Sequence, residues 1–208
     1  MKVSEIFESV QGEGEYLGQR ALFIRLHGCN LKCDFCDSKY TWNGVVWQLT
    51  VENVVESIEK SHCYHVVFTG GEPMLQQKEI HRVVKGVPGG KFYEIETNGT
   101  ISPTIEHAIH LFTVSPKGNF RVARKFFTLK NVVFKFVVDT TMDLRKIEDF
   151  VQLHRVKVPI YLMPQTISLE GHQRKLPMLF DFLKTHPQPD YRITPRLHVL
   201  AFGNKRGV

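Results

Sequence analysis

The chain has 208 residues, of which 42% are hydrophobic and 11% aromatic; this content is typical of a packed globular domain and excludes a disordered chain. Lys and Arg exceed Asp and Glu by six, 27 against 21, but the charges are scattered without a long basic block. The excess fits an anionic small substrate or a basic solvated surface, and we expect no direct binding to nucleic acid. No apolar run is long enough to span a membrane and the N-terminus lacks a secretory pattern, so we expect a cytoplasmic protein.

The first 26 residues contain a glycine-flanked carboxylate and a strand with an unusual charge. A short segment runs into Gln11-Gly12-Glu13-Gly14, where glycine lets the backbone approach a ligand closely and Gln11 can both donate and accept hydrogen bonds. Arg20 to Leu26 is apolar enough for a buried strand, yet it contains Arg25. A guanidinium there needs a carboxylate partner, which the residues alone leave as either a ligand or a structural ion pair.

The segment 27–42, H-G-C-N-L-K-C-D-F-C-D-S-K-Y-T-W, holds three of the four cysteines as C-x3-C-x2-C. Three thiolates in so tight a turn favour a soft metal or an iron–sulfur cluster over disulfides. An electron-transfer cluster normally takes four cysteines, so three ligands predict a cluster with one open iron that can chelate a small molecule. Because this cysteine loop follows a strand directly, we expect it at the ligand-binding edge of a parallel sheet.

The next stretch predicts a helix, a strand and a polar turn. T-V-E-N-V-V-E-S-I-E-K has helical spacing with Thr50 as its N-cap, and Cys63 after it is expected to be a buried thiol and not a fourth ligand. Thr69-Gly70-Gly71-Glu72-Pro73 follows the apolar H-V-V-F-T and precedes a predicted helix from Met74 to about Lys85. The glycines expose backbone groups, and Glu72 supplies an acceptor for an ammonium group.

Strand-like and helical segments alternate to the end of the chain. Strands are predicted at 92–96, 111–114, 132–138 and 158–163, and helices in I-S-P-T-I-E-H-A-I, M-D-L-R-K-I-E-D-F-V-Q-L and R-K-L-P-M-L-F-D-F-L-K. Counting the Arg20 strand first gives six strand–helix units. A full eight-unit barrel usually needs about 250 residues, so we predict one α/β domain over residues 1–208 with an incomplete, open-sided barrel.

Taken together, the cysteine loop and the turn resemble the radical S-adenosylmethionine (SAM) enzymes. Their pattern is C-x3-C-x-aromatic-C, here Cys29, Cys33, Phe35 and Cys36, followed by a G-G-E-like turn, here Gly70-Gly71-Glu72. The resemblance implies a partial TIM-like barrel of six units and a [4Fe–4S] cluster whose open iron binds the amino and carboxylate groups of SAM. It places Glu72 and the adjacent backbone at the methionine ammonium and Phe35 beside the adenine. One electron would then release a 5′-deoxyadenosyl radical that abstracts hydrogen from the substrate.

Within that superfamily the chain is similar to the 7-carboxy-7-deazaguanine synthase family. The match rests on Q-G-E-G, F-I-R-L-H-G-C-N, C-D-S-K-Y-T-W and the final L-H-V-L-A-F-G-N-K-R-G-V, and it runs from near the start of the chain to its last residue. It implies a carbon–nitrogen lyase that contracts 6-carboxy-5,6,7,8-tetrahydropterin to 7-carboxy-7-deazaguanine with loss of ammonia, on the route to queuosine. It also implies a substrate-capping tail, 192–208, and an external one-electron donor such as flavodoxin. An open-sided barrel with exposed edges is compatible with a homodimer.

Carried over residue by residue, the resemblance assigns three sets of contacts. Substrate contacts fall on Val10, Gln11, Gly12, Glu13, Arg25, Thr69, His198 and Val208, whose carboxylate would lie near the substrate. Cofactor contacts fall on Phe35, Gly70, Gly71, Glu72, Ser115, Pro116 and Lys117, and on the more loosely matching Met163, Pro164, Gln165 and Thr166. A Mg²⁺ site falls on Ser38, with substrate and water completing its octahedron. Without the resemblance, His198 would be read as a core histidine.

Three alternatives share the cysteine spacing. A glycyl-radical activase would keep the cysteine loop and the G-G-E turn but has no reason to share the Q-G-E-G segment or the tail. A zinc-stabilised RNA-binding module would use the three cysteines with Cys63 or His27, but it does not need six strand–helix units. An electron carrier would need a fourth nearby cysteine.

Overall fold

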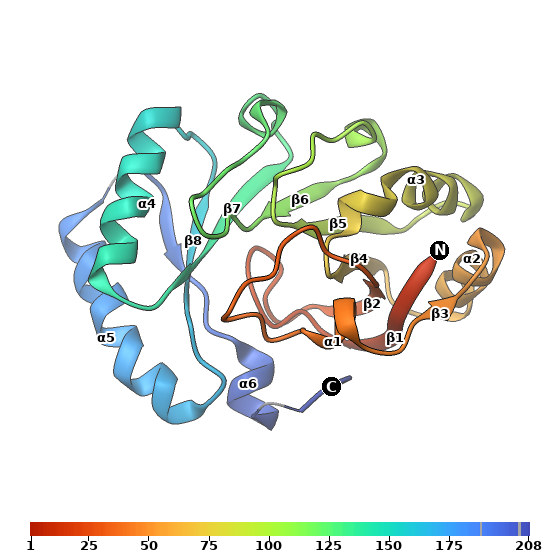
Figure 1. Ribbon diagram of the computed structural model, residues 1–208, viewed down its shortest axis with the longest axis horizontal. Helices are drawn as coiled ribbons and strands as arrows, with labels where there is room; N and C mark the ends of the chain where they lie inside the picture. The colour runs from red at the N-terminus through yellow and green to blue at the C-terminus, as the bar shows by residue number, and fades with distance from the viewer. Residues whose placement is uncertain (188, 204) are drawn as a thin grey trace.

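A single nine-stranded sheet forms the centre of the molecule (Figure 1), described by a computed structural model for residues 1–187, 189–203 and 205–208. The strands are β1 (Lys2–Val10), β2 (Arg20–Leu26), β3 (Trp47–Gln48), β4 (His65–Gly70), β5 (Phe92–Thr97), β6 (Leu111–Val114), β7 (Val132–Val138), β8 (Ile160–Pro164) and β9 (Tyr191–Ile193). Their order across the sheet is β3-β1-β2-β4-β5-β6-β7-β8-β9, and β2 and β4 to β9 are parallel neighbours. The sheet is open, which confirms the predicted open-sided α/β architecture.

All six predicted strands are present, and the structure adds one more parallel strand. β9 has only three residues, too few for a hydrophobic pattern to be recognised in the sequence. At the other side, β1 pairs antiparallel with β2 and with the two-residue β3. The described strands therefore extend the predicted six-strand core at both edges. Asn204, within the predicted capping tail, lies outside the described residues.

The helices predicted from the sequence are present where the helical pattern is long. They are α1 (Tyr40–Asn43), α2 (Val51–Lys60), α3 (Gln77–Gly86), α4 (Thr141–His154), α5 (Leu169–Thr185) and α6 (Leu197–Phe202), with 3₁₀ turns η1 (Pro73–Gln76), η2 (Glu106–Ala108) and η3 (Arg124–Phe127). Thr50 caps α2 as predicted, in a capping box with Asn53. The predicted helix over 101–109 is wrong: Pro103 lacks an amide donor, and that segment forms only η2.

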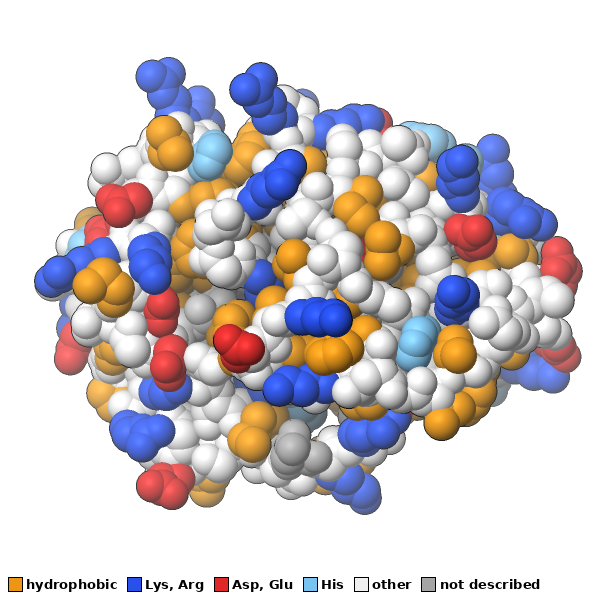
Figure 2. Space-filling model, viewed as in Figure 1, with side chains coloured by type: hydrophobic (Ala, Val, Ile, Leu, Met, Phe, Trp, Pro, Cys, Tyr) orange, Lys and Arg blue, Asp and Glu red, His pale blue; other side chains and the backbone are white. Residues whose placement is uncertain are grey.

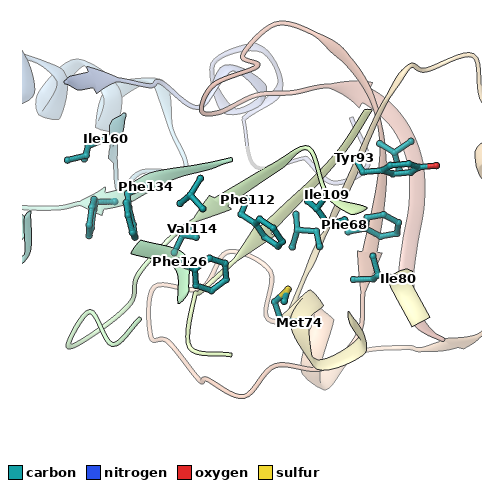
Figure 3. Close-up of a cluster of buried hydrophobic side chains, with 14 of the residues drawn as sticks. Phe68, Met74, Ile80, Tyr93, Ile109, Phe112, Val114, Phe126, Phe134 and Ile160 are labelled. Atoms are coloured by element: carbon teal, nitrogen blue, oxygen red, sulfur yellow. The ribbon is translucent and has the colours of Figure 1, made fainter. Parts of the chain in front are cut away.

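The two faces of the sheet differ in character. On the outer face, residues such as Phe68, Phe112 and Phe134 belong to one large buried core (Figure 3). The inner sides of α2, α3, α4 and α5 contribute to the same core. The opposite face holds two small apolar clusters, one around Phe23 and one around Tyr161. The rest of that inner face is polar, and it is where the candidate site lies. No helix in the described ranges is long and apolar enough to cross a membrane.

Candidate active site

The inner face of the sheet is charged because polar residues alternate with core residues along its strands. In β5, Glu94 and Glu96 alternate with Tyr93 and Ile95, and in β7 the buried Lys135 stands between two phenylalanines. Successive residues of a strand point to opposite faces of the sheet. Because the phenylalanines are buried in the core on the outer face, these charged side chains point to the inner face. The sheet thereby assembles ionisable groups from distant parts of the chain on one surface.

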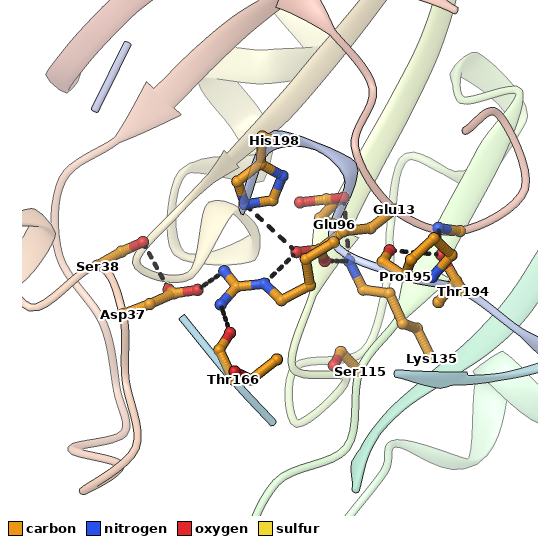
Figure 4. A network of polar contacts seen from close by, with 12 residues as sticks. Glu13, Asp37, Ser38, Glu96, Ser115, Lys135, Thr166, Thr194, Pro195 and His198 are labelled. Atoms are coloured by element: carbon orange, nitrogen blue, oxygen red, sulfur yellow. Dashed lines mark hydrogen bonds and ion pairs between the residues drawn. The ribbon is translucent and has the colours of Figure 1, made fainter. Parts of the chain in front are cut away.

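Lys135 lies at the centre of this surface, between two carboxylates (Figure 4). Its Nζ is 2.7 Å from Oε2 of Glu13 and 3.2 Å from Oε1 of Glu96. Burial by itself lowers the pKa of Lys135, but the two carboxylates outweigh burial and hold that pKa above its ordinary value. Burial likewise raises the pKa of Glu13, whereas Lys135, Arg196 and His198 hold it well below its usual range. At neutral pH the site therefore holds fixed, paired charges.

Three of the residues assigned to substrate contact, Gln11, Thr69 and His198, lie around these carboxylates. Gln11 donates from Nε2 to Oε1 of Glu96 at 3.3 Å, and Thr69 donates from Oγ1 to Oε2 of Glu96 at 2.9 Å. His198 Nε2 lies 3.9 Å from Oε1 of Glu13. Burial lowers the pKa of His198 from its ordinary value, against the opposing attraction of Glu13. The Q-G-E-G segment, β4 and α6 thus meet at one place.

Gly12 allows α6 to approach the Q-G-E-G segment. A Cβ on Gly12 would lie 2.2 Å from Nδ1 of His198, and the carbonyl of Gly12 accepts a hydrogen bond from the amide of Leu197 at 2.9 Å. A side chain at this position would therefore displace His198 or the tail backbone. The neighbour that approaches Gly12 closely in the structure is the tail of the same chain, and the expected close approach of this backbone to a ligand stays a prediction.

Arg25 has a carboxylate partner on the neighbouring strand. Its Nε lies 3.0 Å from Oε2 of Glu5, which it faces across the β1–β2 pair. Tyr40 donates to the same Oε2 at 3.0 Å, and the Arg25 guanidinium lies 5.4 Å from the centre of the Phe7 ring. The ion pair that the sequence left open is present, and it engages Arg25 through Nε.

The cysteine loop packs against the G-G-E turn through its backbone. The amide of Glu72 donates to the carbonyl of Gly28 at 2.8 Å, and the amide of Cys36 donates to the carbonyl of Cys33 at 3.1 Å. All three loop cysteines are free and partly exposed. Burial raises the pKa of the Cys29 thiol and of the Cys33 thiol, the latter offset in part by Lys117. Three free thiols on one loop suit a cluster, in which each thiolate binds a different iron atom.

This arrangement differs from a mononuclear metal site. Among the described residues, no group of three His, Cys, Asp or Glu side chains converges closely enough to hold one metal ion. Cys63 is 1% exposed in the outer core, two residues before β4 begins, whereas the cysteine loop follows the other end of β2. Because β2 and β4 are parallel, the length of a strand separates Cys63 from the loop. Cys63 is therefore the buried thiol that the sequence predicts.

Glu72, which was expected to contact an ammonium group, is buried and its carboxylate is hydrogen-bonded within the protein. It is 1% exposed, and its carboxylate accepts from the amide of Met74 at 3.0 Å, from Oγ1 of Thr97 at 2.6 Å and from the amide of Asn98 at 2.7 Å. Glu72 therefore joins the turn after β4 to the turn after β5. Its contact with a cofactor stays a prediction, and the observed bonds position the backbone of Gly70 and Gly71.

Replacing Gly71 with alanine is expected to disrupt the contact between the turn and the loop. The added Cβ would lie 2.0 Å from the carbonyl oxygen of Gly28 and 3.1 Å from Cβ of Cys29. Backbone would have to move, at a cost of about 1–3 kcal/mol in the free energy of unfolding. Chemical denaturation measures the loss of stability, and iron content after reconstitution measures whether the disrupted loop still holds a cluster. Gly86→Ala at the end of α3, whose Cβ would meet only Val55, is the matched control; equal losses in both variants would contradict the prediction.

The remaining assigned residues lie around this centre with different exposure. Phe35 is 40% exposed on the cysteine loop, and Ser38 donates from Oγ to Oδ1 of Asp37 at 2.9 Å. Lys117 contacts the hydroxyl of Ser115 just after β6, and burial lowers the pKa of Lys117. Val10 is exposed at the end of β1, and Val208 is half-buried. Pro116 is buried just after β6, Met163 and Pro164 are buried at the end of β8, and Gln165 and Thr166 follow β8.

The sequence interpretation missed four charged residues of this site, namely Asp37, Glu96, Lys135 and Arg196. Two of them carried a signal, since the alternating charges in F-Y-E-I-E-T and the lone charge in V-V-F-K-F-V-V indicate inward-facing polar positions. The other two lie in irregular segments, where only the folded chain shows what a side chain meets.

Comparison with known proteins places this arrangement in a class. The Radical SAM superfamily pattern matches residues 23–146, which run from within β2 through the cysteine loop, the G-G-E turn and β4 to β7 into α4. The crystal structure of QueE from Escherichia coli superposes with a TM-score of 0.74 at 23% identity over 95% of this chain and 94% of that one. Streptococcus suis SuiB bound to S-adenosylmethionine superposes with a TM-score of 0.60 at 12% identity, over 80% of this chain and 48% of that one. Fold and cysteine loop together define a radical SAM protein.

Curated relatives narrow the class. The 7-carboxy-7-deazaguanine synthase of Pyrobaculum aerophilum is 36% identical, covering 100% of this chain and 97% of its own length. The enzyme of the same name from Clostridium acetobutylicum is 33% identical, covering 100% and 99%. The chain belongs to the 7-carboxy-7-deazaguanine synthase family of the radical SAM superfamily, and is an enzyme that uses a [4Fe–4S] cluster and SAM. This membership confirms the resemblance seen in the sequence and argues against the three alternatives, namely a glycyl-radical activase, a zinc-stabilised RNA-binding module and an electron carrier.

Proposed function

We propose that this chain converts 6-carboxy-5,6,7,8-tetrahydropterin to 7-carboxy-7-deazaguanine with loss of ammonia, as a step toward queuosine and related 7-deazapurines. The observation that carries the proposal is the paired-charge centre of Glu13, Glu96 and Lys135 on the inner face, beside the cysteine loop. A small heterocycle with polar edges and one carboxylate requires fixed donors and acceptors of this kind.

The cysteine loop would hold the cluster through Cys29, Cys33 and Cys36. When bound, the cluster and SAM supply a one-electron cleavage that yields a 5′-deoxyadenosyl radical. The exposed Phe35 is available to cover an adenine, and the backbone of Gly70 and Gly71 to receive the methionine end of SAM. The cofactor contacts would be completed by Ser115, Pro116 and Lys117 after β6, and by the segment from Met163 to Thr166 at the end of β8.

The chain's own residues would orient the substrate through charge and hydrogen bonding. Gln11 and Thr69 already donate to Glu96, so both side chains present donors on the inner face where a heterocycle would bind. Burial lowers the pKa of His198 and so favours the neutral imidazole, which can donate from one ring nitrogen and accept at the other. Val10 and Gly12 would border the substrate on the side of the Q-G-E-G segment.

Arg25 would bind the substrate carboxylate. Glu5 engages it through Nε, which leaves its two terminal nitrogens as donors for a bidentate contact. Glu5 is shared with the tail, because Arg206 donates from Nε to Oε1 of Glu5 at 3.0 Å and its guanidinium lies 3.5 Å from the centre of the Tyr40 ring. The tail would thereby offset the charge of Glu5 and close the mouth of the site near Val208.

Arg206→Gln is expected to raise KM for the pterin roughly two- to fivefold with little change in kcat, because an exposed pair and a cation–π contact are each worth about 1 kcal/mol or less. Steady-state kinetics on the reconstituted enzyme measure this. Lys205→Gln, which removes the neighbouring exposed charge, is the control. A rise in KM of equal size in both variants would show a general charge effect in place of a specific anchor.

A Mg²⁺ ion would bind beside Ser38. The adjacent Asp37 places a second oxygen ligand there, and substrate and water would supply the rest of an octahedron. Titration of product formation with Mg²⁺ in wild type and in Ser38→Ala tests the site.

We also propose an external one-electron donor such as flavodoxin, a homodimer and a cytoplasmic location. Lys32 and Lys39 are exposed on the cysteine loop and could meet an acidic donor, although Figure 2 shows basic side chains spread among acidic and apolar ones over the visible face. Leu200 and Phe202 of α6 are 36% and 56% exposed and offer apolar area to a second copy. The salt dependence of reduction and light-scattering mass measurements test the first two, and fractionation of cells the third.

The test of the reaction is anaerobic. The protein is reconstituted with iron and sulfide, and reductant, Mg²⁺, SAM and 6-carboxytetrahydropterin are added, with products followed by mass spectrometry. We expect 7-carboxy-7-deazaguanine. Formation of 5′-deoxyadenosine without it would keep the radical SAM class and reject the substrate.

A further inference from the structure

Arg196 joins three segments that are far apart in the sequence. Its Nε donates to Oε1 of Glu13 at 2.9 Å, its Nη1 donates to the carbonyl of Thr166 at 2.8 Å, and its Nη2 pairs with the carboxylate of Asp37. Figure 4 shows these three partners, Asp37, Thr166 and Glu13, close together although they come from different segments. The planar group is therefore satisfied in three directions, a geometry that lysine cannot reproduce.

The position of Arg196 is fixed from its backbone. Its amide donates at 3.1 Å to Nε2 of His172, a residue of α5 that is 1% exposed, and Nδ1 of His172 lies 2.9 Å from the carbonyl of Ser168. With Nδ1 donating to that carbonyl, Nε2 is the acceptor that the amide of Arg196 needs. The Arg196 side chain is 9% exposed. The guanidinium is thus held in place by the fold and does not depend on a ligand.

The two carboxylates that Arg196 binds belong to different functional segments. Asp37 directly follows Cys36 on the cysteine loop, and Glu13 belongs to the Q-G-E-G segment. Glu13 keeps a second cation in Lys135, whereas the other partner observed for Asp37 is the hydroxyl of Ser38. Removal of Arg196 would therefore release mainly the cysteine loop and leave Glu13 paired.

We propose that Arg196 is a positioning residue that fastens the cysteine loop to the substrate side of the site. It sets where the radical is generated relative to the substrate carbon that is attacked. The restraint of the loop stands on the geometry alone, and its effect on coupling rests on the proposed function. A displacement of about 1 Å between reacting atoms can cost roughly 100-fold in rate.

The first test uses the protein without cluster and does not require turnover. In Arg196→Gln, trypsin is expected to cut after Lys32 and Lys39, both exposed on the loop, at least about fivefold faster than in wild type. Asp37→Asn should have the same effect without touching Glu13. Arg192→Gln is the matched control, since Arg192 lies on the same tail but pairs with Glu15 and Asp190. Unchanged cleavage at both lysines in Arg196→Gln and Asp37→Asn would overturn the proposal.

The second test measures coupling in the reconstituted enzyme. In Arg196→Gln the ratio of 5′-deoxyadenosine to 7-carboxy-7-deazaguanine should rise at least about threefold, because SAM is still cleaved while the substrate is out of position. Parallel loss of both products at an unchanged ratio would reduce Arg196 to a stabilising residue and overturn its positioning role. If wild type cleaves SAM without making the deazapurine, the proposed reaction fails, while the proteolysis result still decides whether Arg196 restrains the loop.

Discussion

Cys33→Ser is expected to abolish iron incorporation and, with it, the reductive cleavage of SAM. Cys33 is the middle cysteine of the loop, and a hydroxyl is a poor replacement for a thiolate on iron. The remaining Cys29 and Cys36 cannot retain a cluster that needs three protein ligands. Iron and sulfide content and the visible absorbance of the reconstituted protein measure the first effect, and 5′-deoxyadenosine formation the second.

Cys63→Ala provides the control for this prediction. Cys63 is buried in the outer core near the start of β4, away from the cysteine loop, so its removal should leave the cluster and the cleavage of SAM unchanged. The expected cost is confined to stability, since a small cavity forms under α2. A Cys63→Ala protein without iron, or a Cys33→Ser protein with a full complement of iron and normal cleavage, would contradict the assignment of ligands.

Lys135→Met is expected to destabilise the protein by about 3–5 kcal/mol and to remove turnover. The Lys135 side chain is 6% exposed, and the substitution leaves the carboxylates of Glu13 and Glu96 facing each other across the inner face without their shared cation. Urea unfolding measures the loss. Lys60→Met, which removes a 74% exposed lysine paired with Glu56 on α2, should cost about 1 kcal/mol or less. Similar losses for the two variants would show that the centre contributes no more than a surface pair.

Wild type and Lys135→Met should also differ in how their stability depends on pH. Because the folded pKa of Glu13 lies below its unfolded value of about 4.3, its pairing contributes stability in full above that pH, and the contribution is lost as pH falls toward the folded pKa. Lys135→Met removes the strongest attraction that lowers this pKa. The stability difference between wild type and Lys135→Met should therefore be largest near neutral pH and shrink below about pH 4.3. A difference that grows on acidification would reject this account.

The sequence by itself determined the cysteine loop, the G-G-E turn and the six core strands, because each depends on local chemistry. Cysteine spacing limits the possible ligands, and β-branched runs such as 132–138 have few alternatives to a buried strand. Thr50 was identified from the sequence as the N-cap of α2, and the structure adds Asn53 as its partner in a capping box. The family resemblance added the Q-G-E-G segment and the tail. His198 of the tail lies near Glu13, and the substrate contacts assigned to both segments stay predictions.

Only the tertiary structure decided which charges meet. Glu13 and Lys135 are 122 residues apart, and Arg196 and Asp37 are 159 apart, so no local pattern connects them. Their pairing depends on the parallel strand order and on the return of the chain from β9 across the open side to the Q-G-E-G segment. For the same reason the partner of Arg25 could not be read from its strand: Glu5 faces it through the register of β1 against β2. Electrostatic contacts follow distance in space, which the fold sets and the sequence order does not.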